Sequence, residues 1–118
     1  MSDDPQRIVL ENLFGPDADL DKFNWQPFKE GIEIYRIYGD GLGGAAAALL
    51  RYKAGASVPL HRHPDYEMVL ILRQGQSDAG GSYPAGTLLV SRPGSQHEVR
   101  SVAGCVVLII WNKPVEFI

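Results

Sequence analysis

Three histidines and one glutamate occupy positions at which their side chains could share a metal ion. His61 and His63 are separated by one residue, and His97 is the third and last histidine of the chain. Residues i and i+2 of a β-strand point to the same face, with their Cα atoms about 6.6 Å apart. Imidazole nitrogens at this spacing can converge on one ion at metal–nitrogen distances of about 2.0–2.1 Å.

Glu67 can join these histidines only if the chain turns after His63. In an extended chain the Cα atoms of His63 and Glu67 would lie about 13 Å apart, which is too far for one ion. Pro64-Asp65 can supply the turn, because proline fixes φ and donates no backbone hydrogen bond. Glu67 would then begin a strand beside the one that carries His61 and His63, while His97 opens a further strand.

Each of these residues taken alone has an ordinary interpretation. A His-x-His pair at a strand end is more often solvated surface, and a lone glutamate is more often an exposed charge. However, every histidine of the chain falls into one spaced pattern. Three imidazoles and one carboxylate suit a first-row divalent metal, so we predict one divalent ion held by His61, His63, Glu67 and His97.

The elements that must position this site are predicted to be short strands. Apolar segments recur between turns rich in Gly and Pro, which number 13 and 8, and this pattern is typical of a β-sandwich or barrel. We expect one all-β domain over residues 25–118, preceded by a polar N-terminal arm over residues 1–24. The expected strands are 32–38, 45–52, 66–72, 87–90, 99–102 and 105–111, with a possible short strand at 7–10 and a helical turn near 19–23.

Composition excludes several classes of protein. The net charge of -3 and the absence of a basic stripe argue against a nucleic-acid partner. The longest apolar run is strand-sized, so no membrane span is expected, and the acidic start at residues 1–5 is unlike a signal peptide. Cys105 is the single cysteine, which excludes an intrachain disulfide, and we expect it to pack in the core. These features fit a cytoplasmic protein.

Two segments resemble the paired motifs of the cupin superfamily. Residues 55–67, GASVPLHRHPDYE, resemble the first motif, in which a glycine precedes His-x-His and a later glutamate. Residues 86–97, GTLLVSRPGSQH, resemble the second motif, which ends in histidine. The glycine that closes the first motif is expected at Gln74. Here the nearest glycine is Gly75, so we expect a hairpin that is one residue longer.

Within the cupins, the chain is most similar to the cupin domain of ChrR-type anti-sigma factors. The phrases that carry the likeness are WQP at 25–27, HRHP at 61–64, YPAGT at 83–87 and PGSQH at 93–97. The resemblance implies a cupin jelly-roll β-barrel, an antiparallel β-sandwich, with one metal ion inside. Zinc is the expected ion, and Fe, Mn, Ni and Co are the alternatives. Such factors also carry an N-terminal helical zinc domain. No His or Cys precedes Trp25, so sigma-factor binding is not expected.

Two functions follow as expectations. The first is a stand-alone ChrR-like metal cupin that binds a small molecule in the barrel as a sensing or accessory module. The alternative is an enzyme, a non-haem metal-dependent dioxygenase of the diketone-cleaving type. No catalytic residue is assigned, because alternation along the strands turns Arg62, Glu98 and Arg100 outward, and Tyr66 sits at the turn.

Aromatic residues near the two ends of the domain are expected to pack in the core or at an interface. They are Phe23, Trp25, Phe28 and Trp111. Barrel sheets leave one face to be covered, so we expect a homodimer.

Overall fold

The computed structural model describes residues 6–118 and contains ten β-strands and one short 3-10 helix. The acidic start of the predicted arm, residues 1–5, lies outside the described residues. The elements are η1 Leu20–Lys22, β1 Gln26–Lys29, β2 Ile32–Tyr38, β3 Ala46–Tyr52, β4 Ala56–Arg62, β5 Glu67–Asp78, β6 Gly81–Pro84, β7 Leu88–Ser91, β8 Gln96–Ser101, β9 Cys105–Trp111 and β10 Glu116–Phe117.

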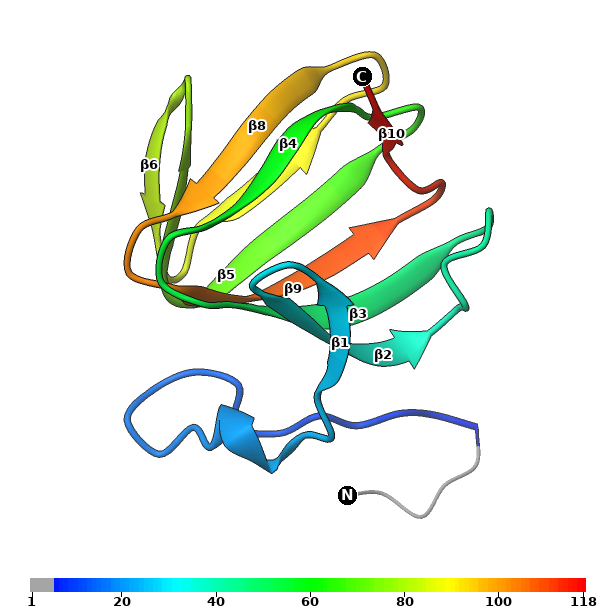
Figure 1. Cartoon of the computed structure of the whole chain (residues 1–118). Helices are drawn as coiled ribbons and strands as arrows, with labels where there is room; N and C mark the ends of the chain where they lie inside the picture. The colour runs from blue at the N-terminus through cyan, green and yellow to red at the C-terminus, as the bar shows by residue number, and fades with distance from the viewer. Residues whose placement is uncertain (1–5) are drawn as a thin grey trace.

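The prediction of an all-β domain is confirmed. All strand pairs are antiparallel, and they form two facing sheets that curl into a half-open barrel (Figure 1). One sheet runs β1-β2-β3-β9-β5-β7, and the other contains β10, β4, β8, the end of β5 and β6. The expected strands 32–38 and 105–111 have the observed bounds, whereas residues 7–10 form no strand.

Two apolar clusters lie on opposite faces of the first sheet. The inner cluster fills the barrel with alternate residues of β2, β3, β5 and β9, among them Ile34, Leu50, Ile71 and Val107. The outer cluster forms where the chain before β1 packs on the sheet, and Leu20 is 1 % exposed there. This packing explains why the segment lies across the sheet in Figure 1. Within residues 6–118 no helix has the length and apolar character that a membrane crossing requires.

The remainder of the outer face is apolar and uncovered. Met68 pairs with Val90 across β5 and β7, and both side chains are exposed, as is Leu88. β7 is also the edge strand of its sheet. The homodimer expected from the sequence stays a prediction.

An irregularity in β5 lets one strand serve both sheets. The register against β9 shifts between Ile71 and Arg73, and Gln74 has a φ of 59°. Gln74 is the position at which the cupin motif places glycine, the residue that adopts a positive φ without steric cost. Gln74 itself takes the left-handed conformation here, and the longer hairpin expected from Gly75 stays a prediction. Gly75 is restricted for a different reason, since a Cβ there would lie 2.7 Å from the Tyr83 carbonyl oxygen.

We predict opposite effects of substitutions at these two neighbours. Gln74→Gly should stabilise the protein by about 0.5 kcal/mol, because relief of a left-handed cost of roughly 1–2 kcal/mol outweighs the extra chain entropy of glycine, about 0.5–1 kcal/mol. Gly75→Ala should destabilise it, because β6 blocks the methyl group. Urea unfolding followed by circular dichroism measures both. A loss of stability in Gln74→Gly would contradict this account.

Candidate metal centre

Strands β4 and β8 bring His61 and His97 together. His61 on β4 is the register partner of His97 on β8. His63 follows the last residue of β4, yet it stays attached to the turn before β8. Its N–H donates to the Ser95 carbonyl at 2.9 Å, and its carbonyl accepts from the Gly94 N–H at 2.7 Å. The spacing in the sequence and this pairing therefore place three imidazoles at one end of the barrel.

The three imidazole rings surround a single point. Their centroids are separated by 5.1 Å for His61–His63, 4.6 Å for His61–His97 and 4.9 Å for His63–His97. One nitrogen of each ring lies within 4.8 Å of the others, a separation that one metal ion can bridge. His61 and His63 are buried, while the His97 side chain is 21 % exposed. The convergence of the histidines that the sequence suggested is thus found in the structure.

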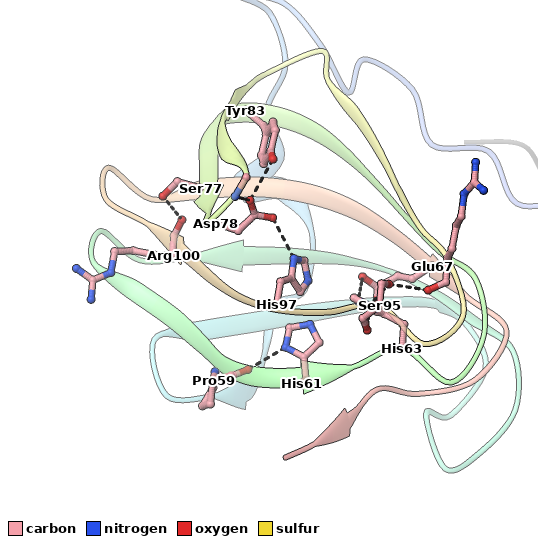
Figure 2. A network of polar contacts seen from close by, with 12 residues as sticks. Pro59, His61, His63, Glu67, Ser77, Asp78, Tyr83, Ser95, His97 and Arg100 are labelled. Atoms are coloured by element: carbon pink, nitrogen blue, oxygen red, sulfur yellow. Dashed lines mark hydrogen bonds and ion pairs between the residues drawn. The ribbon is translucent and has the colours of Figure 1, made fainter.

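Hydrogen bonds fix which nitrogen of each ring faces this point. His61 Nδ1 lies 2.8 Å from the Pro59 carbonyl, His63 Nδ1 lies 3.1 Å from the Ser95 carbonyl, and His97 Nδ1 lies 3.1 Å from Asp78 Oδ2 (Figure 2). Carbonyl and carboxylate oxygens only accept, so each Nδ1 carries the proton and donates. Each Nε2 is then left with a free lone pair, which is the form of imidazole that binds metal.

Glu67 lies beside one histidine rather than among all three. It begins β5 and is 7 % exposed, and its Oε1 lies 3.4 Å from His63 Nε2. Its carboxylate does not belong to the group of ligand atoms that lie within 4.8 Å of one another, which contains the three histidines. The expectation that its strand pairs with the histidine strand is wrong. At Glu67, β5 pairs with β7 and β9, so the carboxylate approaches the histidines from the opposite sheet.

Burial and neighbouring charge shift the pKa values of two histidines in opposite directions. Burial, opposed by the Pro59 hydrogen bond and aided by the neighbouring histidines, lowers the pKa of His61 below 6.5. Burial also acts to lower the pKa of His63, but the adjacent Glu67 carboxylate outweighs it, and the pKa of His63 is raised above 6.5. Without a cation at the centre, Glu67 therefore favours a proton on His63.

The orphaned nitrogen of His63 supports a cation at this point. His63 Nε2 is buried and has no hydrogen-bond partner. A buried polar atom left unpaired costs roughly 1–3 kcal/mol, so such atoms in folded proteins normally have a partner. A divalent ion shared with the other two imidazoles would satisfy it, and the donor set therefore fits a first-row metal.

Sequence reasoning missed Asp78, which orients His97. Asp78 Oδ2 accepts from His97 Nδ1, while Asp78 Oδ1 accepts from the Gly80 N–H at 2.8 Å and from the Tyr83 hydroxyl at 3.0 Å (Figure 2). Burial tends to raise the pKa of Asp78, but these donors outweigh it and lower that pKa below 3.8. Asp78 is thus an anionic acceptor behind the imidazole, an arrangement common at metal-binding histidines.

The charged residues next to the histidines face solvent, as alternation predicts. Arg62, Glu98 and Arg100 are exposed, and Arg62 forms an ion pair with Glu116 at 2.6 Å. Cys105 is 2 % exposed and belongs to the inner core, as expected, and burial raises the pKa of its thiol.

A cavity of about 310 Å³ opens beside the histidines inside the barrel. Its walls are mainly apolar and include Val69, Val107 and Ile109, while His61, His97 and Glu67 lie on its lining. Its volume is at the lower end of the range for small-molecule sites. The arrangement can therefore hold a cation and place a small molecule against it.

The chain belongs to the family of ChrR cupin-like domains, whose model matches residues 17–116. This confirms the resemblance drawn from the two motifs. The match begins before Trp25, in agreement with the packing of Leu20 on the sheet. No curated protein sequence matches the chain significantly.

Solved structures share the cupin fold at low sequence identity. One contains the anti-sigma factor ChrR of Rhodobacter sphaeroides in complex with SigE (TM-score 0.69, 23% identity), and the match covers 80% of this chain and 51% of that one. This chain thus spans about half the length of that relative. Another is the acetylacetone dioxygenase of Acinetobacter johnsonii, with a TM-score of 0.72 and 19% identity, which covers 80% of this chain and 72% of that one. A third is a putative acetylacetone dioxygenase of Methylibium petroleiphilum, with a TM-score of 0.74 and 15% identity, which covers 94% of this chain and 85% of that one.

We predict that Asp78→Asn weakens zinc binding about 10- to 100-fold, because the carboxylate that orients His97 and holds its Nδ1 proton is lost. Competition against a chromophoric chelator measures this affinity. Asp21→Asn is the matched control, since Asp21 pairs with Arg51 away from the cluster and should bind zinc normally. Equal affinity in Asp78→Asn and the unmodified protein would show that this contact does not position the imidazole.

Zinc binding should also strengthen as the pH rises. The folded pKa of His63 is raised, so its protonation stabilises the metal-free fold below pH 6.5, and this contribution is lost as pH rises through the folded value. Zinc must displace that proton, which changes its affinity by about tenfold per pH unit below the pKa. The rise in melting temperature on adding zinc should be larger at about pH 7.5 than at about pH 5.5. An equal rise at both values would argue against binding through His63.

Proposed function

We propose that this chain is a metal-binding cupin that holds one divalent cation through His61, His63, His97 and Glu67. The observation that carries the proposal is the orientation of the three rings. Every Nδ1 is occupied by an outer acceptor, and the inward Nε2 of His63 is buried without a partner. Glu67, whose Oε1 lies 3.4 Å from that nitrogen, is the proposed fourth ligand.

Zinc is the proposed ion. Three imidazoles and one carboxylate offer four donors of the kinds that zinc binds, and four is the number that it takes in most protein sites. Iron, manganese, nickel or cobalt would also accept these ligands. When bound, the ion would supply a Lewis acid at one end of the cavity.

We propose further that the domain uses the cavity to bind a small molecule, as a sensing or accessory module. Membership of the ChrR cupin-like family supports this function, together with the 310 Å³ cavity, whose lining includes three of the proposed ligands, His61, His97 and Glu67. The structurally similar ChrR is an anti-sigma factor. We do not extend sigma-factor binding to this chain, because the likeness covers 51% of that protein.

The alternative is a metal-dependent dioxygenase that cleaves a small diketone. Its support is the fold of one acetylacetone dioxygenase and of one putative acetylacetone dioxygenase, the latter matching over 94% of this chain and 85% of its own length. Oxygen uptake by protein reconstituted anaerobically with Fe(II), measured with acetylacetone, separates the two functions. Uptake that depends on both iron and diketone establishes the enzyme. Zinc in the purified protein and no uptake with iron support the sensing or accessory module.

The metal assignment predicts the effect of single substitutions. His61→Ala or His97→Ala should abolish stoichiometric metal in the purified protein, because the chain has three histidines and none to spare. Elemental analysis measures the content, and circular dichroism verifies the fold. Arg62→Ala is the control, since Arg62 lies between two proposed ligands but points to solvent and pairs with Glu116. Metal content that is unchanged in both histidine variants overturns the assignment.

A further inference from the structure

Two buried side-chain atoms in residues 6–118 have no hydrogen-bond partner, and both lie at the site. One is His63 Nε2, which the proposed metal ion would satisfy. The other is the indole nitrogen of Trp111, Nε1, a group that only donates. Trp111 is 8 % exposed and lies on the cavity lining, so its N–H requires an acceptor inside the barrel.

Trp111 stands next to the proposed metal ligand. It is the last residue of β9 and the register partner of Glu67 at the start of β5. Paired residues on adjacent antiparallel strands project to the same face, with Cβ atoms about 4.5–5.5 Å apart. A molecule that accepts the indole N–H is therefore adjacent to the histidine cluster. The other tryptophan provides a contrast, since Trp25 Nε1 donates to the Leu20 carbonyl at 2.9 Å.

The cavity lining also carries two cations without a carboxylate partner. Lys29 on β1 and Arg36 on β2 line the cavity, are exposed, and form no ion pair with any residue in the described chain. Lys29 Nζ lies 4.5 Å from the ring centroid of Phe117. That ring lies 6.0 Å from the ring of His61, which connects Lys29 to the proposed metal centre.

The lining also carries two carboxylates, and each of them already has a contact within the protein. The carboxylate of Asp40 accepts the Leu42 N–H at 2.9 Å, and that of Glu67 faces His63. What the cavity leaves unsatisfied is one indole N–H and two positive charges, within apolar walls.

From these contacts we propose that the cavity binds a small carboxylate with a short apolar body. One carboxylate oxygen accepts the Trp111 N–H beside the metal centre, the apolar body lies against the aliphatic walls, and Lys29 and Arg36 attract the anion. This inference rests on the proposed function, because the cation at the histidines offsets the negative charge of Glu67 next to the bound carboxylate.

The test uses zinc-loaded protein and a matched pair of probes, isovalerate and isovaleramide, which have the same shape and differ in charge. The indole N–H signals of the two tryptophans are followed by nuclear magnetic resonance. Isovalerate should shift the Trp111 signal and leave that of Trp25 unchanged. Its Kd should be at least about tenfold lower than that of the amide, as charge-assisted hydrogen bonds are stronger than neutral ones. Equal affinity for the two probes, or binding without a shift of the Trp111 signal, overturns the inference.

Variants separate the two kinds of contact. Trp111→Phe assigns the signal and should raise the Kd for isovalerate about tenfold. Lys29→Gln combined with Arg36→Gln should raise it about three- to fivefold, as expected for partly solvated charges, and should leave the Kd of the amide unchanged. Lys29 and Arg36 are both exposed, so the double variant should fold even if Trp111→Phe does not. Lys113→Gln is the control, an exposed cation outside the cavity lining that should have no effect.

Elemental analysis distinguishes failure of the inference from failure of the proposed function. Protein that takes up one zinc but binds isovalerate no better than isovaleramide retains its metal site and has no carboxylate site. Protein that takes up no zinc lacks the proposed function, and the inference that rests on it is then overturned as well. An unchanged Kd for isovalerate in the double variant and in Trp111→Phe also overturns it.

Discussion

The arrangement of the site depends on one constraint, that each histidine donates its Nδ1 proton to an oxygen behind it. An imidazole has two nitrogens, and the hydrogen bond at one determines what the other can do. Here a carbonyl of β4, a carbonyl of the turn before β8 and a carboxylate at the end of β5 each hold one ring. Because these acceptors come from different strands, the orientation of the rings is a property of the sandwich as a whole.

Strand β5 links the two halves of the site. Its first residue, Glu67, belongs to one sheet, and its last, Asp78, belongs to the other. A regular strand would place residues 67 and 78 on opposite faces, because their separation is an odd number. The irregularity between Ile71 and Arg73 and the left-handed conformation of Gln74 change this parity. The same strand thereby places the Glu67 carboxylate against His63 and the Asp78 carboxylate against His97.

The groups that line the cavity, rather than the fold, carry the information about a ligand. Cupin structures similar to this one include an anti-sigma factor and dioxygenases, so the barrel alone does not select a function. In this chain the buried indole N–H of Trp111 has no acceptor within residues 6–118, and the exposed cations Lys29 and Arg36 form no ion pair there. Such groups discriminate among ligands by charge, whereas the aliphatic walls select by size alone.

The sequence by itself determined what depends on local chain geometry. Alternation at 32–38 and a continuous apolar run rich in β-branched residues at 105–111 gave these two strands their correct bounds, and the His-x-His spacing put His61 and His63 near each other. Arg62 between them is exposed for the same reason. The two-residue period of a strand is a property of the backbone, so it can be recognised without knowing which strands pair.

Only the tertiary structure decided the contacts that join distant strands. The pairing of β5 with β7 and β9 at Glu67, the approach of Asp78 to His97 and the unpaired indole of Trp111 have no local signature. A change of register by one residue exchanges the faces of a strand, and the irregularity in β5 does this within a single element. Sequence alternation therefore could not show that Asp78 faces the site or that Trp111 lacks a partner.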